Sequence, residues 1–136
     1  MKALLEFYLR YFDFLYLDSR YRFTDSKTDG ANAAITVTGP DLTWSVSVDR
    51  GQFQLSIAPT RSPRTGFWVS LIKQYLEGNK DIAYLSAKDE VEWARGHLGS
   101  IEQLFADPAG MESVCNELRI LQRENAEKQW GPAATN

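Results

Sequence analysis

The fold is decided by residues 35–57, ITVTGPDLTWSVSVDRGQFQLSI, in which apolar and polar residues alternate with a period of two. Such alternation is typical of strands with one buried and one solvated face, and it favours antiparallel pairing. It is interrupted at residues 39–41 (GPD) and 49–51 (DRG), which have the composition of short turns. Residues 35–57 therefore predict three strands of an antiparallel meander.

The residues before this stretch predict a helix, a further strand and a loop. Tyr21 and Phe23 alternate with polar neighbours and indicate a fourth strand, and residues 26–32 have the composition of a longer polar loop. Apolar residues at helical spacing predict a helix over residues 3–15. Its apolar stripe consists of Leu4, Leu5, Tyr8, Tyr11, Phe12 and Leu15.

The period changes from two to that of a helix after residues 58–66 (APTRSPRTG), an exposed connector with two prolines. A first helix begins near Trp68 and ends at residues 78–79, and a second begins at the cap residue Ser86 and ends near Ala106. A third helix follows and ends near residue 129. Strands followed by helices in this way are typical of an α+β fold.

We therefore expect a single α+β domain over residues 1–136. It has an N-terminal helix, a four-stranded antiparallel meander and three C-terminal helices packed on one face of the sheet, with residues 130–136 as a frayed tail. A chain of 15.4 kDa is long enough for one domain with its own core. On this prediction Trp44 and Trp68 lie in the core, whereas Trp93 and Trp130 are the better candidates for exposure.

Composition excludes several classes of function. The net charge of -3 argues against a general nucleic-acid binder, and one Cys with one His excludes a disulfide framework or a Cys/His zinc site. The charge is uneven, since residues 1–66 hold eight basic and seven acidic residues and residues 67–136 hold seven basic and eleven acidic ones. The expected helical half is therefore the acidic half.

The expected compartment is the cytoplasm. The first residues contain charges at Glu6, Arg10 and Asp13, so they do not fit the apolar run of a secretory signal, and no segment has the length of a membrane span. The lone Cys115 has no partner within the chain, which suits a reducing compartment.

No residue set predicts catalysis. His97 could serve a nucleophile such as Cys115 or Ser100, but no nucleophile elbow, phosphate-binding loop or metalloprotease motif occurs. Glu90 and Glu92 are two positions apart, and side chains at this spacing do not face each other on a helix. We therefore expect no enzyme, no cofactor and no bound metal.

The candidate binding residues form three groups. Two acids lie in the polar stretch after the first strand, three polar residues lie at a hairpin tip, and four residues lie at the start of an acidic helix. They are Asp25 and Asp29, then Asp49, Arg50 and Gln52, then Asp89, Glu90, Glu92 and Trp93. An ordinary turn and a solvated helix face are the competing interpretations.

The sheet itself is a further candidate surface. Its expected outward residues are small and neutral, so they lack the aromatic and basic side chains of an RNA-binding sheet. They are Thr36, Thr38, Ser45, Ser47, Gln52, Gln54 and Ser56. Such a surface suits a protein partner or solvent.

The segment from Tyr21 to Pro59, with YRFTDS and ITVTGPDLTWSVSVDRGQFQLSIAP, followed by Trp68 and two acidic helices, resembles small bacterial immunity proteins of contact-dependent growth inhibition and polymorphic toxin systems. The resemblance implies a binder without catalytic activity, a monomer that forms a 1:1 heterodimer with a cognate toxin C-terminal domain. Such toxins are often nucleases that cut tRNA, and the inhibitor covers their active site or substrate surface. It implies no direct contact with nucleic acid or membrane. A secretion chaperone and an enzyme of unknown class are the alternatives.

Overall fold

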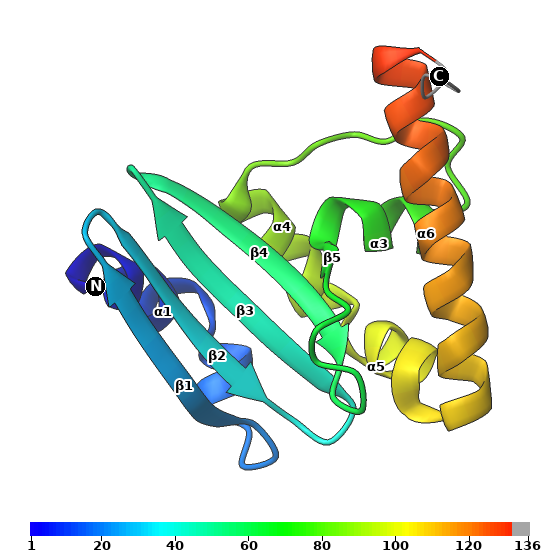
Figure 1. Ribbon diagram of the computed structural model, residues 1–136. Coiled ribbons are helices and arrows are strands. Elements are labelled where there is room, and N and C mark those ends of the chain that lie inside the picture. The colour runs from blue at the N-terminus through cyan, green and yellow to red at the C-terminus, as the bar shows by residue number, and fades with distance from the viewer. Residues whose placement is uncertain (132–136) are drawn as a thin grey trace.

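The computed structural model describes residues 1–131 and has an α+β architecture (Figure 1). An N-terminal pair of helices precedes a five-stranded sheet, and four helices follow it. The helices are α1 (Lys2–Tyr11), α2 (Asp13–Tyr16), α3 (Val69–Glu77), α4 (Ala87–Gly96), α5 (Leu98–Ala106) and α6 (Pro108–Trp130). The strands are β1 (Arg22–Asp29), β2 (Asn32–Thr38), β3 (Leu42–Asp49), β4 (Gln52–Pro59) and β5 (Phe67–Trp68).

The sheet is an antiparallel meander in the order β1-β2-β3-β4-β5. Its central strands are the three that the alternation predicts. At the tip between β3 and β4, Asp49 pairs with Gln52, and both Arg50 and Gly51 have positive φ angles of 50° and 84°. Two positive φ angles in a two-residue loop indicate a type I′ turn, whose twist matches that of the flanking strands.

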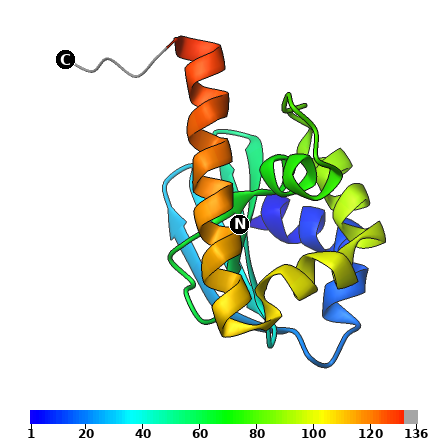
Figure 2. The ribbon, with the colours of Figure 1, turned by 90° about the vertical axis from the view of Figure 1, so that its right-hand side faces the viewer.

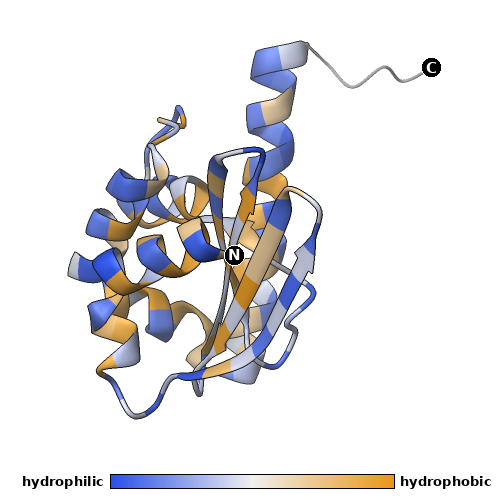
Figure 3. Cartoon of the chain, turned by 90° about the vertical axis from the view of Figure 1, so that its left-hand side faces the viewer, coloured by the Kyte–Doolittle hydropathy of each residue, from blue (hydrophilic) through white to orange (hydrophobic). Residues whose placement is uncertain are grey.

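The core lies between the sheet and a helical layer on one of its faces (Figures 2 and 3). Trp44 of β3 is completely buried and contacts Phe12 and Phe14 edge to face, with ring centroids 5.8 and 5.9 Å apart. Helix α1 packs against β3, and α3 and α4 pack against β4. Helix α6 is different, because its main contacts are with α3 and α5 rather than with the sheet.

The prediction of a loop over residues 26–32 is wrong, because most of these residues belong to strands β1 and β2. Strand β1 continues to Asp29, pairs with β2, and is followed by a tight turn at Gly30, which has a φ of 59°. All eight residues of this edge strand are exposed, so the alternation of apolar residues that marks a half-buried strand is absent. A bulge between Phe23 and Asp25 disrupts the strand's pairing with β2, a device that also discourages edge-to-edge association.

Two predicted helices are each divided in the structure. The helix expected over residues 3–15 is interrupted at Phe12, and the one expected from Ser86 to Ala106 is interrupted at His97, whose φ of -127° is not helical. Gly96 and Gly99 flank this second break and weaken helical continuity. Trp130, predicted to begin the tail, is the last residue of α6; residues 132–136 lie outside the described residues.

Strand β5 is absent from the sequence-based prediction, which placed Trp68 on the buried face of a helix. Instead Trp68 pairs with Ser56 in the sheet, and its side chain is 44% exposed. Helix α3 begins one residue later, at Val69. A strand of two residues is too short to show a period, so Trp68 was predicted as part of the helix that follows.

Gly39 lies against the buried ring of Tyr21, and a Cβ at position 39 would be only 2.3 Å from that ring. The ring is fixed because its hydroxyl donates a hydrogen bond to Glu102 over 2.7 Å. We expect Gly39→Ala to lower the free energy of unfolding by about 1–3 kcal/mol through overpacking. Urea denaturation measures this change. Gly96→Ala, at a helical position with open space, is the control and should not destabilise; equal stability of the two variants would contradict the contact.

Candidate protein-binding surface

The face of the sheet opposite the helices has no helix over it in residues 1–131 (Figures 2 and 3). We call it the bare face. Because Ile35, Trp44 and Leu55 point into the core, their neighbours in sequence point to the bare face. The strand register aligns those neighbours in rows that cross the sheet.

The first row lies at the hairpin tips and consists of Asp29, Asn32, Asp49 and Gln52. The next row consists of Lys27, Ala34, Ser47 and Gln54, and the third consists of Asp25, Thr36, Ser45, Ser56 and Trp68. The bare face thus has charges on β1 and at the hairpin tips, small hydroxyl side chains in its centre and a tryptophan at its β5 side.

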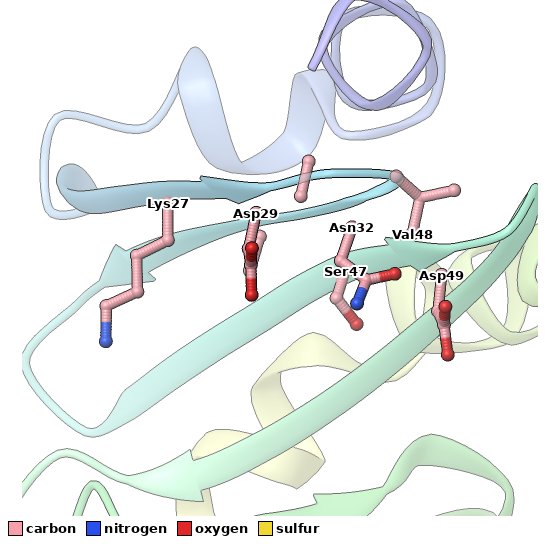
Figure 4. A pocket seen from close by; sticks show the side chains of 8 residues that line it. Lys27, Asp29, Asn32, Ser47, Val48 and Asp49 are labelled. Carbon is pink, nitrogen blue, oxygen red and sulfur yellow. The ribbon is translucent and has the colours of Figure 1, made fainter.

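A shallow cavity of about 220 Å³ lies at the tip end of the bare face. Figure 4 shows Lys27, Asp29, Asn32, Ser47 and Asp49 projecting to the same side of the strands. The ion pairs nearby are exposed, with 3.9 Å between Lys27 Nζ and Asp25 Oδ2 and 3.3 Å between Arg50 Nε and Asp49 Oδ1. Exposed pairs of this kind add little stability, so these side chains can exchange partners at low cost.

Five of the nine predicted binding residues therefore lie together on the bare face or at its edge: Asp25, Asp29, Asp49, Arg50 and Gln52. The small neutral centre of the face was also predicted. Sequence reasoning missed Lys27, Asn32 and Trp68. Gly30 could have revealed Lys27 and Asn32, because a glycine at this place can form a tight turn between two paired strands. Lys27 and Asn32 then belong to those strands and not to a loop.

The other four predicted residues lie on α4, in the helical layer, and do not form one surface. Asp89 and Glu92 are exposed, while Trp93 is half-buried, donates from Nε1 to Glu77 Oε2 over 3.2 Å and stacks on His97. Glu90 is only 7% exposed, so the prediction of an exposed side chain on the acidic helix face is wrong, whereas its role in binding stays a prediction. The hydrogen bond from Asp89 N to Ser86 Oγ confirms Ser86 as the helix cap.

Glu90 instead binds the first turn of α3. Its Oε2 accepts hydrogen bonds from the backbone N–H and from the Oγ of Ser70, both over 2.8 Å, and Ser70 Oγ accepts one from Leu85 N over 3.1 Å. A carboxylate is favourable here because the first N–H groups of a helix have no partner within it. Burial nevertheless raises the pKa of Glu90, since the loss of solvation outweighs the stabilisation by Ser70.

This raised pKa predicts a pH-dependent stability difference between the wild type and Glu90→Gln. Glu90 contributes stability while it is protonated, below its ordinary pKa of 4.5, and this contribution is lost as pH rises through the raised pKa of the folded state. Gln does not titrate and keeps an oxygen that can accept from Ser70. The stability of Glu90→Gln relative to wild type should therefore increase between about pH 3 and about pH 7.

Urea denaturation across this pH range measures the difference, with the exposed Glu92→Gln as the matched control. A relative stability of Glu90→Gln that stays constant or falls with pH would contradict the burial of a charged Glu90.

Within residues 1–131, the contacts of His97 and Cys115 include no side chain that would activate either of them as a base or a nucleophile. His97 Nδ1 lies 2.7 Å from the carbonyl oxygen of Trp93, and Cys115 is buried, which raises its pKa. Across residues 1–131, no group of three His, Cys, Asp or Glu side chains is arranged to hold a metal ion. No helix in that range is long and apolar enough to cross a membrane.

A second exposed feature adjoins the bare face at β5. Trp68, Tyr84 and Trp130 are 44%, 65% and 80% exposed, and all three line a cavity of about 190 Å³ between β5, residues 82–84 and α6. We call this the aromatic cleft. Exposure of Trp130 was predicted from the sequence, whereas that of Trp68 was not.

No protein-family model, curated protein or solved structure matches this chain.

Proposed function

We propose that this protein is an immunity protein that binds and neutralises a cognate toxin domain, a nuclease such as a tRNase, in the cytoplasm. The observation that carries the proposal is the bare face, a sheet surface with a small-residue centre, a tryptophan at one side and charged residues on β1 and at the hairpin tips. Protein interfaces combine a well-packed centre with aromatic anchors and a polar rim in this way.

The size of the bare face suits this role. The four long strands, β1 to β4, are about 4.8 Å apart and about 25 Å long, which gives about 500 Å² in projection. A standard interface takes about 800 Å² from each partner. The bare face with the aromatic cleft and the hairpin tips supplies an area of that order.

The charge distribution supports a basic partner. Residues 67–136 have four more acidic than basic residues, and the helices they form carry most of the acidity. A nuclease has a basic substrate surface, and opposite charges accelerate encounter. The acidic helices do not cover the bare face (Figures 2 and 3), so their charge acts on the approach of the partner rather than by contact within the interface. The partner is a protein rather than RNA, because the centre of the bare face has no aromatic or basic side chains for bases to stack on.

The test is complex formation with the toxin domain encoded immediately upstream of this chain. We expect a 1:1 complex on size exclusion with light scattering, and loss of the toxin's nuclease activity at equimolar protein. His97→Ala should inhibit as well as wild type, because no catalysis is involved. Separate elution of the two proteins, or a toxin that stays active, would contradict the proposal.

A secretion chaperone is the second candidate, favoured by one observation. Three apolar residues of the N-terminal part are exposed, Leu9 in α1, Leu17 directly after α2 and Phe23 in the edge strand β1. A chaperone uses such residues to form a dimer and to hold an extended effector segment. A dimeric free protein that binds an unfolded effector segment would favour the chaperone, and a monomer that binds a folded domain would favour the immunity protein.

A further inference from the structure

A cavity of about 200 Å³ lies beside the aromatic cleft, where strand β4 loses its neighbour. Strand β5 pairs with Ser56 and Ile57 alone, so residues 53–55 of β4 have no further strand beside them in the part of the chain that the structure describes, and they form one wall. The cavity is large enough for several waters or for the head group of a long side chain. The lining residues are Phe53, Gln54, Leu55, Trp68, Ser70, Tyr84, Leu85 and Glu90.

Among residues 1–131, Glu90 is the only charged residue of this lining. Its Oε2 is held by Ser70, as described above, which fixes the carboxylate in place. Its Oε1 accepts no hydrogen bond from any residue in 1–131. This oxygen is still accessible to solvent, because it is not one of the fully buried polar atoms that lack a partner in this part of the chain. Glu90 is 7% exposed and lines the cavity, so it keeps one oxygen that is neither hydrogen-bonded nor sealed from solvent within residues 1–131, with no basic residue among the lining residues of that range to neutralise it.

Aromatic side chains complete the cavity. Trp68 and Tyr84 line it and remain 44% and 65% exposed, so their rings are available to a ligand. Aromatic faces attract cations, and a carboxylate forms charge-assisted hydrogen bonds with them. A guanidinium group suits both the aromatic rings and the carboxylate, because it is planar, stacks on rings and donates hydrogen bonds to carboxylates.

We propose that this cavity receives an arginine side chain of the partner protein, with the guanidinium donating to Glu90 Oε1 and stacking on Trp68 or Tyr84. The identity of the occupant as a protein side chain rests on the proposed function, which supplies a basic partner. The position of the cavity supports it, because Trp68 belongs both to the bare face and to the lining. A partner on the bare face can therefore insert a side chain at its β5 side.

The test is a titration of the full ¹⁵N-labelled chain with Nα-acetyl-arginine methylamide, followed by NMR. We expect saturable shifts of the Trp68 indole N–H and the Ser70 amide, and much smaller shifts with the citrulline analogue, which has the same shape without the charge. Equal responses to the two compounds would overturn the proposal.

Variants then assign the site. Glu90→Gln should bind the arginine compound about tenfold more weakly or worse, as expected for the loss of one charge-assisted hydrogen bond. Glu92→Gln, which removes an exposed charge from the same helix, should bind like wild type. Trp68→Leu leaves Glu90 in place and should also weaken binding. Undiminished binding by both Glu90→Gln and Trp68→Leu would overturn the proposal.

The arginine-binding test and the toxin-binding test can fail independently of each other. Arginine binding by a chain that does not bind the toxin domain would contradict the immunity role and leave a cation site. Toxin binding that is equal for wild type and Glu90→Gln, without binding of the arginine compound, would leave the immunity role and contradict this cavity.

Discussion

Replacement of Trp44 by alanine is expected to lower the free energy of unfolding by about 3–5 kcal/mol, which is the usual cost of truncating a large buried aromatic residue. Trp44 is completely buried and packs against Phe12 and Phe14, so it joins the sheet to the N-terminal helices. Small domains are stable by only about 5–15 kcal/mol, so this loss is a large fraction of the total free energy of unfolding. Urea denaturation followed by circular dichroism measures the loss.

Trp44→Phe is the matched control. It keeps an aromatic ring and removes Trp44 Nε1, a buried N–H without a hydrogen-bond partner in residues 1–131. Removing an unpaired buried donor offsets part of the lost packing, so Trp44→Phe should lose much less stability than Trp44→Ala. A loss below about 1 kcal/mol for Trp44→Ala would contradict the position of Trp44 in the core.

Ser45→Arg is expected to weaken binding of the toxin domain about 30-fold or more. Ser45 lies at the centre of the bare face, between Thr36 and Ser56 on the adjacent strands. A large basic side chain there blocks close contact and repels a basic partner, and central interface positions contribute about 2 kcal/mol or more. Stability should change by no more than about 0.5 kcal/mol, because the side chain points away from the core.

Ser100→Arg provides the matched control, since it makes the same substitution at an exposed position of α5 in the helical layer. Titration calorimetry with the toxin domain compares the two variants. Weak binding by Ser100→Arg together with full binding by Ser45→Arg would move the interface from the bare face to the helices.

The centre of the sheet could be predicted from the sequence because its strands have one buried face. Ile35, Trp44 and Leu55 alternate with polar residues, and the structure buries all three. The extent of β1 could not be predicted in this way, because an edge strand with eight exposed residues has no burial pattern. Strand β5 was missed for a different reason, since two residues are too few to show a period.

The candidate site was predictable only in part. Asp49 and Gln52 flank a turn whose glycine is visible in the sequence, so their pairing at a hairpin tip could be expected. The burial of Glu90 could not, because it depends on Ser70, which lies twenty residues earlier and reaches Glu90 only through the packing of α3 against α4. The spacing of residues along one helix predicts which of them share a face, but the contact between Ser70 and Glu90 joins two helices.

The most direct test of the account is growth of cells that produce the toxin domain together with wild type, Ser45→Arg or Ser100→Arg at equal levels. We predict that wild type and Ser100→Arg restore growth and that Ser45→Arg restores it poorly or not at all. Cells that stop growing despite wild-type protein, or that grow equally well with Ser45→Arg, would contradict a toxin-neutralising role for the bare face.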